Sequence, residues 1–155
     1  MLIMEDVDDR VPLKTGTRLS FNNGRSYTVT DVIGMGGGGI VYKAVTPEGR
    51  TDAIKEIYPY ELHRDRNDDG SIRFLGTDER DMYDIVCEDA RQRESYFSRL
   101  IAGRGDNPNV IQSEFYRGVY INDSDQETDI AYLVMNRLVG CTLAEFIDEC
   151  GCRVK

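Results

Sequence analysis

Five glycines fall within the six residues 34–39, in the stretch "IGMGGGGIVYKA", and Gly34, Gly36 and Gly39 have the spacing G-x-G-x-x-G. Glycine loses more conformational freedom on folding than any other residue, so such a run needs a physical reason. One interpretation is a flexible linker or a loose hairpin. The other is a glycine-rich loop whose backbone amides approach phosphate groups.

The residues around the glycines separate the phosphate-binding types. A dinucleotide-binding turn would open a helix, but the β-branched and aromatic segment after Gly39 predicts a strand. A P-loop needs Gly-Lys-Ser/Thr, which the sequence lacks. The pattern therefore favours a glycine hairpin between two antiparallel strands, which requires a lysine on the next strand near a small side chain. The segment "DAIKE" supplies Lys55 and Ala53.

The hydrophobic pattern predicts the elements that must position these residues. Alternation with short turns indicates strands, and an apolar period of 3 to 4 residues indicates a helix. The predicted strands are 26–33, 39–46, 50–59, 110–121 and 128–138, with a further short strand candidate at 17–21. The predicted helices are a long one at about 78–102 and a short one at 142–149. Mostly antiparallel strands with one long helix between them predict an α+β fold.

Four motifs in order resemble those of protein kinases, specifically the amino-terminal lobe of bacterial Ser/Thr kinases, over about residues 17–148. They are "IGMGGGGIVYKA" for the glycine-rich loop, "AIKEIYP" for the lysine strand, "NPNVI" for the turn after the regulatory helix, and "AYLVMNRLVGCTLAEFI" for the hinge region. The resemblance implies a kinase-like N-lobe: a five-stranded antiparallel sheet with one long helix, and a short helix after the hinge. It divides the chain into an acidic, poorly ordered tail (1–16), the lobe (17–137), and the hinge with the start of the next helix (138–155).

The resemblance also implies roles for single residues. Lys55 would neutralise the α- and β-phosphates of ATP and pair with a glutamate of the long helix, for which Glu94 fits better than Glu88. The resemblance places three side chains against the adenine: Ile33, Val41 and Ala53. It places Gly34, Gly36 and Gly39 at the phosphates. Met135 would be the gatekeeper, and Asn136 and Leu138 would bind the adenine edge through their backbone.

Two residues depart from the family's pattern. Gly38 stands at the loop tip, where the family usually has an aromatic residue, and Asp52 stands before Ala53, where the family prefers valine. Alternation along a strand points Asp52 to the same side as Ile54, away from Ala53.

A kinase also needs a catalytic aspartate and a metal-binding Asp-Phe-Gly, both in its carboxy-terminal lobe. We therefore expect ATP as the cofactor, Mg²⁺ binding only with that lobe, and no activity for this 155-residue chain alone. One hypothesis is the ATP-binding lobe of a Ser/Thr protein kinase that acts on a protein substrate when joined to a C-lobe. The other is a stand-alone, pseudokinase-like module that binds nucleotide or protein, with self-association through an exposed face around Met135 and Leu138.

Composition and short motifs argue against several other classes of protein. A net charge of −9 and a pI near 4.6 argue against a nucleic-acid surface. No apolar stretch approaches the roughly 20 residues that span a bilayer, no signal peptide is evident, and the four scattered cysteines predict reduced thiols, so we expect a cytoplasmic protein. Residues 65–72 match the start of an EF-hand loop, but Gly76 replaces its glutamate ligand, so we expect a solvated acidic loop and no metal site.

Overall fold

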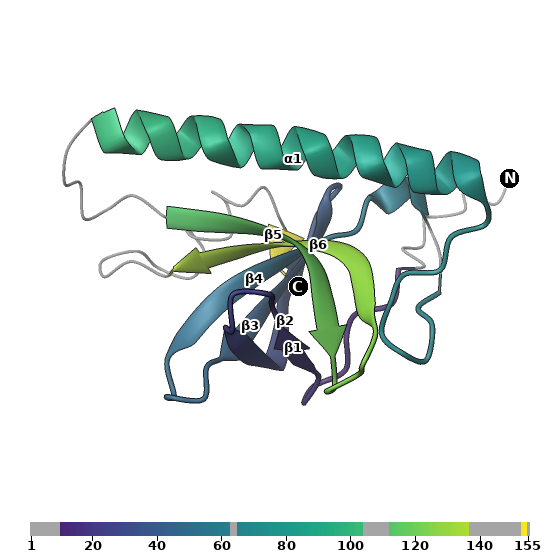
Figure 1. Ribbon diagram of the computed structural model, residues 1–155, viewed down its shortest axis with the longest axis horizontal. Helices are drawn as coiled ribbons and strands as arrows, with labels where there is room; N and C mark the ends of the chain where they lie inside the picture. The colour runs from purple at the N-terminus through teal and green to yellow at the C-terminus, as the bar shows by residue number, and fades with distance from the viewer. Residues whose placement is uncertain (1–9, 63–64, 104–111, 137–152, 155) are drawn as a thin grey trace, which may run out of the picture.

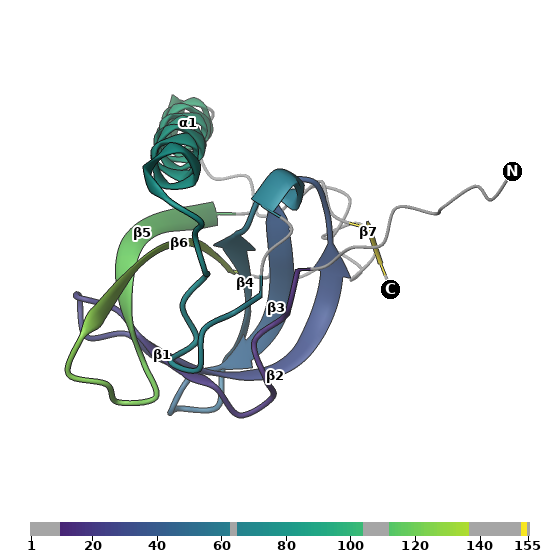
Figure 2. The ribbon, with the colours of Figure 1, turned by 90° about the vertical axis from the view of Figure 1, so that its right-hand side faces the viewer.

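The alternating apolar segments pair into a closed antiparallel barrel, seen in a computed structural model that describes residues 10–62, 65–103, 112–136 and 153–154 (Figure 1). Its elements are β1 (Arg18–Ser20), β2 (Ser26–Met35), β3 (Gly39–Val45), β4 (Thr51–Ile57), the 3₁₀ turn η1 (Tyr60–Leu62), α1 (Thr77–Gly103), β5 (Gln112–Ile121), β6 (Glu127–Asn136) and β7 (Arg153–Val154). The strand order is β1-β5-β6-β4-β3-β2, with β7 added beside β2. A pairing of β1 with β2 closes the ring, which Figure 2 shows nearly end-on.

The predicted fold class, a kinase-like N-lobe with a five-stranded antiparallel sheet, one long helix and a short helix after the hinge, is wrong. Six strands close into a barrel, and the described residues contain a single α-helix. Closure depends on β1, because Leu19 pairs with Tyr27 of β2 on one side and with Ile121 of β5 on the other. The register shifts in the β2–β3 and β5–β6 pairings are irregularities of the kind that bend and twist strands. The short helix predicted at 142–149 lies outside the described residues.

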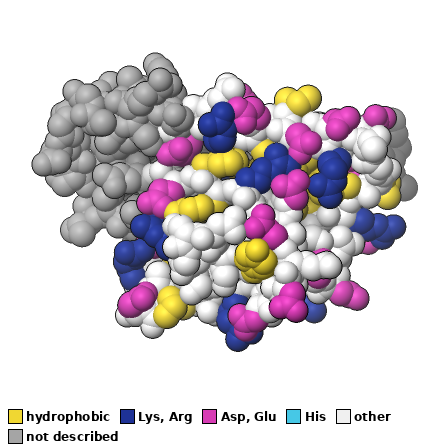
Figure 3. Space-filling view, in the orientation of Figure 1, with side chains coloured by type: hydrophobic (Ala, Val, Ile, Leu, Met, Phe, Trp, Pro, Cys, Tyr) yellow, Lys and Arg dark blue, Asp and Glu magenta, His cyan; other side chains and the backbone are white. Residues whose placement is uncertain are grey.

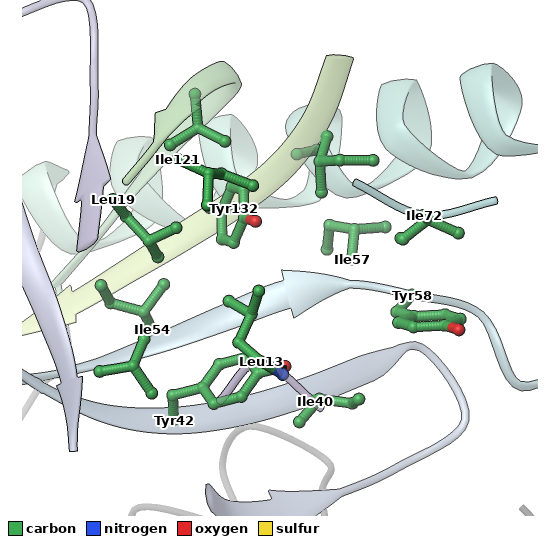
Figure 4. Packing of buried hydrophobic residues seen from close by; sticks show 14 of the residues in the cluster. Leu13, Leu19, Ile40, Tyr42, Ile54, Ile57, Tyr58, Ile72, Ile121 and Tyr132 are labelled. Atoms are coloured by element: carbon green, nitrogen blue, oxygen red, sulfur yellow. Dashed lines mark hydrogen bonds between the residues drawn. The ribbon is translucent and has the colours of Figure 1, made fainter. Parts of the chain in front are cut away.

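The barrel interior is filled by large side chains, many of them aromatic (Figure 4). Fully buried members of this core are Leu19, Tyr27, Ile40, Tyr42, Ile54, Ile130 and Tyr132. They come from β1, β2, β3, β4 and β6, as expected when alternate residues of every strand face inward. The same alternation leaves the other face of each strand for α1 and for the candidate site.

The helix α1 lies along the outside of the barrel next to β5 and β6 (Figures 1 and 2). The fully buried Tyr83 attaches the helix to the barrel. Its hydroxyl donates a hydrogen bond to the carbonyl of Ile57 at 2.8 Å and accepts one from the N–H of Ala131 at 2.9 Å. Arg117 of β5 adds ion pairs with Asp84 of the helix and with Asp129 of β6. Among the described residues, no helix has the length and apolarity that crossing a membrane requires.

We expect Tyr83→Phe to lower the free energy of unfolding by about 1–3 kcal/mol, because it leaves a buried carbonyl and a buried N–H without their partner. Chemical denaturation followed by circular dichroism measures the change. Tyr120→Phe is the matched control, since Tyr120 is a half-buried tyrosine of β5 whose hydroxyl has no hydrogen-bond partner among the described residues. Equal stability of the two variants would show that Tyr83 does not fix the helix.

The loop at residues 65–76 is less solvated than the sequence predicted. Ile72 is 2 % exposed, and Gly70 lies so close to Ile121 that a Cβ there would come within 2.9 Å of that side chain. The Asp69 carboxylate accepts hydrogen bonds from the N–H of Ser71 at 2.9 Å and from its hydroxyl, and these bonds lower the pKa of Asp69. The carboxylate thus holds the loop's own turn.

Surface charge is mixed. Figure 3 shows acidic and basic side chains interspersed over the face that carries α1, without a large region of one sign.

Candidate functional site

The glycines form a tight turn that is fixed through its carbonyl groups. The N–H of Gly36 donates to the carbonyl of Gly39 at 3.0 Å, which closes the turn between β2 and β3. The carbonyls of Gly37 and Gly38 accept hydrogen bonds from the N–H groups of Tyr60 and Tyr58, at 2.8 and 3.0 Å. The run is therefore neither a linker nor a loose hairpin, because its turn is anchored to the segment after β4.

Gly39 is required by packing. A Cβ on this residue would lie 2.0 Å from the carbonyl oxygen of Glu56, a distance that no real side chain tolerates. The start of β3 approaches the end of β4 this closely only because Gly39 has no side chain. One glycine of the G-x-G-x-x-G pattern thus has a structural reason that the sequence interpretation did not include.

Lys55 extends from β4 to the glycine turn. A Cβ placed on Gly38 would lie 3.6 Å from the Nζ atom of Lys55, in ordinary van der Waals contact. In the sheet, Lys55 pairs with Val41 on one side and Leu133 on the other, and its side chain is half-buried. The ammonium group and the glycine turn, 16 to 19 residues apart in the sequence, are therefore neighbours in space.

Beside Lys55 lie three buried apolar side chains that we call the outer patch: Val41, Ala53 and Met135, exposed by 0 %, 4 % and 5 %. Ala53 pairs with Met135, and Val41 pairs with Lys55, so all four residues share one face of the sheet. Among the described residues, these three are the buried apolar side chains that do not belong to the barrel core. The resemblance assigned Val41 and Ala53 to the adenine and Met135 as the gatekeeper.

The structure gives fewer contacts for the other residues that the resemblance assigned to the site. Gly34 pairs with Val41, and Ile33 is half-buried beside it where the register of β2 shifts. Asn136 ends β6 opposite Gln112, which leaves its backbone at the strand end. Leu138 lies outside the described residues.

The glutamate that would pair with Lys55 stays a prediction. Glu94 is partly buried on α1, whereas Glu88 is exposed and held by Arg91 and Gln92 of its own helix. Hydrogen bonds from Arg91 and then Gln92 lower the pKa of Glu88 to about 2. Glu88 therefore interacts with residues on the surface of its own helix. Glu94 is the better candidate for the ion-pair partner of Lys55.

Sequence reasoning missed a buried charged cluster directly behind Lys55. The next residue, Glu56, faces the barrel interior with no exposed surface. Arg66 holds its carboxylate in a fork, with Nη1 and Nη2 at 2.8 and 2.7 Å from the two oxygens, and the hydroxyls of Tyr42 and Tyr132 donate to the same oxygens at 2.8 and 3.1 Å. Burial opposes the charge of Arg66, but the carboxylate outweighs it, so the pKa of the guanidinium is raised. A charged residue in a strand ordinarily predicts solvent exposure, so no local signal marked Glu56.

Asp52 faces the same side of β4 as Ile54, as alternation predicted. It is 3 % exposed and accepts hydrogen bonds from the Tyr27 hydroxyl at 3.1 Å and from Arg50 at 3.0 Å. Burial first, and then the charge of Asp52, raises the pKa of Tyr27. The Asp52 carboxylate therefore accepts its hydrogen bonds inside the barrel, on the face of β4 opposite Lys55.

The tripeptide His63-Arg64-Asp65 has the letters of a kinase catalytic-loop motif, but its position does not fit. It precedes α1, and Gly70 stands five residues after Asp65, where the motif has asparagine. Asp65 is exposed, with its carboxylate 3.9 Å from Arg73; the other two residues lie outside the described part of the chain. We therefore assign no catalytic role to Asp65.

Two grooves lie elsewhere on the barrel. One, of about 430 Å³, is formed by the β1–β2 and β3–β4 turns, and the other, of about 570 Å³, lies between the 67–77 segment and the β5–β6 hairpin. Neither groove includes Lys55 or a residue of the glycine turn. The candidate site is therefore defined by the proximity of its residues.

Comparison with known proteins gives one solved structure. No family model matches the sequence, and no curated protein matches it. The chain is similar to PpkA-294 in its apo form, with 29 % sequence identity and a TM-score of 0.59, over 89 % of this chain and 43 % of that one. The chain thus spans less than half the length of PpkA-294.

Proposed function

We propose that this chain is the ATP-binding lobe of a Ser/Thr protein kinase, which transfers the γ-phosphate to a protein substrate when joined to a catalytic lobe. The observation that carries the proposal is the position of the Lys55 ammonium beside Gly38, next to a buried apolar patch outside the barrel core. The order of the sequence motifs and the similarity to PpkA-294, which points to a kinase-like fold, support it.

The polarity of the glycine turn suits an anion. Its carbonyl groups are bonded to the chain, whereas within the described residues the N–H groups of Gly37 and Gly38 donate no hydrogen bond. Two such amides beside a lysine ammonium form a positively polarised site that suits phosphate oxygens. Positive charge at this point would neutralise phosphate groups.

The outer patch suits a purine. Ala53 presents only a methyl group on this face, with Met135 opposite it on β6 and Val41, the partner of Lys55, diagonal to it on β3. A flat aromatic ring laid on this patch would gain from apolar contact, while Asn136 at the end of β6 brings backbone groups to the ring edge. Lys55 lies two residues from Ala53 on the same face of β4, which would place the base and the phosphates side by side.

The described residues do not supply a metal site. They contain no group of three or more His, Cys, Asp or Glu side chains that could hold an ion. In the proposal, the carboxylates for Mg²⁺ and the catalytic base therefore come from the catalytic lobe, and this chain contributes nucleotide binding. The alternative, a stand-alone module that binds nucleotide or protein without catalysis, shares this site and differs only in lacking that partner lobe.

The experiment is a titration of the ¹⁵N-labelled chain with ATP and, separately, with adenosine, followed by NMR. We expect ATP to shift the Gly37 and Gly38 amide signals with about millimolar affinity, because each missing charged contact costs about 1.5–3 kcal/mol of binding. Adenosine should shift signals of the outer patch and leave the two glycines unchanged. A parallel assay with Mg²⁺ and a generic protein substrate should show no phosphate transfer.

Two outcomes would contradict the proposal. If saturating ATP shifts neither the glycine amides nor the outer patch, the site does not bind nucleotide. Phosphate transfer that Lys55→Ala abolishes would show that the chain needs no second lobe.

A further inference from the structure

An arginine that precedes the barrel reaches the glycine turn. Arg10 is 5 % exposed although it lies near the start of the described chain, eight residues before β1. Its Nη1 atom donates hydrogen bonds to the carbonyl of Gly36 and to the carbonyl of Tyr58, both at 2.7 Å. The guanidinium carbon also lies 5.9 and 5.4 Å from the ring centroids of Tyr58 and Tyr60, within the range of cation–π attraction.

The segment that carries this arginine is itself fixed to the barrel. Leu13 is buried in the core, and its N–H donates a hydrogen bond to the hydroxyl of Tyr42 at 2.9 Å, drawn as a dashed line in Figure 4. The carbonyl of Val11 accepts a hydrogen bond from Nε of Arg66 at 2.9 Å. Residues 10–13, which we call the strap, therefore hold the Arg10 guanidinium at a defined place.

With the strap in position, each carbonyl of the glycine turn has a donor. Gly37 and Gly38 are bonded to the N–H groups after β4, and Arg10 bonds the third carbonyl, that of Gly36. Because one nitrogen bridges Gly36 and Tyr58, it ties the first residue of the turn to the same segment that anchors the other two. A glycine turn has little conformational preference of its own, so its shape depends on such ties.

We propose that Arg10 is a positioning residue for the phosphate site, through which the strap holds the glycine turn in the shape that presents the Gly37 and Gly38 amides to phosphate. The inference rests on the proposed function for its ligand, but the ordering of the turn by Arg10 does not need a ligand. Arg10 contacts carbonyl oxygens, so it acts through the turn and not on the nucleotide.

The test compares Arg10→Met, which keeps the side-chain length and removes the donors, with Lys14→Met, which removes the same charge from an exposed position of the same segment. We expect Arg10→Met to weaken ATP binding about tenfold and to leave adenosine binding unchanged, since only the phosphates meet the turn. Lys14→Met should bind both like the wild type, and Arg10→Lys should recover part of the ATP affinity. An equal loss for ATP and adenosine, or no loss for ATP, would overturn the inference.

A second measurement separates this inference from the proposed function. Without nucleotide, amide hydrogen exchange of Tyr58 and Tyr60, whose N–H groups donate to the carbonyls of Gly38 and Gly37, should be faster in Arg10→Met and Arg10→Lys than in Lys14→Met. If the wild type does not bind ATP, the proposed function fails, and exchange alone then decides whether Arg10 orders the turn. Unchanged exchange in both Arg10 variants would refute the strap. If Arg10→Met does not fold, the same comparison is made with Arg10→Lys.

Discussion

Replacing Glu56 with leucine is expected to lower the free energy of unfolding by about 3–5 kcal/mol, which is a large share of the total stability of a domain this size. The change leaves the guanidinium of Arg66 buried at 8 % side-chain exposure without its counter-ion. It also removes the acceptor for the hydroxyls of Tyr42 and Tyr132. Removing one partner of a buried ion pair is costly because the remaining charge stays away from water.

A double-mutant cycle tests whether the cost comes from the unpaired charge. Arg66→Met alone should also destabilise strongly, but Glu56→Leu with Arg66→Met should cost clearly less than the sum of the two, because no uncompensated charge remains. The exposed pair of Arg25 and Glu114, at 3.0 Å, is the matched control, and its removal should cost about 1 kcal/mol or less. Additive effects at Glu56 and Arg66 in urea denaturation would show that the pair is not energetically coupled.

Replacing Lys55 with methionine is expected to weaken ATP binding about 10- to 100-fold, since a charge-assisted contact to phosphate is worth about 1.5–3 kcal/mol. Methionine keeps most of the length and apolar surface of the lysine, so the packing against Val41 and Leu133 should change little. Adenosine has no phosphate, and its affinity should stay within about twofold of the wild type.

Lys14→Met serves as the control for charge, because Lys14 is exposed, directly follows the strap and is not part of β4. Thermal unfolding of both variants confirms that the fold is retained, and the NMR titration gives the two affinities. If Lys55→Met binds ATP like the wild type, Lys55 is not the phosphate lysine, whatever its distance from the glycine turn. If adenosine affinity falls as much as ATP affinity, the substitution has disturbed the outer patch.

The proximity of glycine turn and lysine could be predicted from the sequence because it depends on local geometry. A turn joins β2 to β3, a second turn joins β3 to β4, and the two-residue period of strands then puts Ala53 and Lys55 on one face. The same period predicted that Asp52 faces away from them, and the register confirms it. Within a meander of adjacent strands, alternation and turn length are sufficient to place side chains.

Closure of the barrel, the charged cluster and the strap were decided by the tertiary structure. The partners are distant in sequence: Arg10 bonds Tyr58 across 48 residues, and Tyr132 bonds Glu56 across 76. A three-residue strand such as β1 has too few positions to show a period, and a lone arginine or glutamate ordinarily predicts exposure to solvent. Their burial becomes favourable only when the folded chain supplies the opposite charge or the carbonyl groups, because a buried charge without such partners costs more than exposure to water.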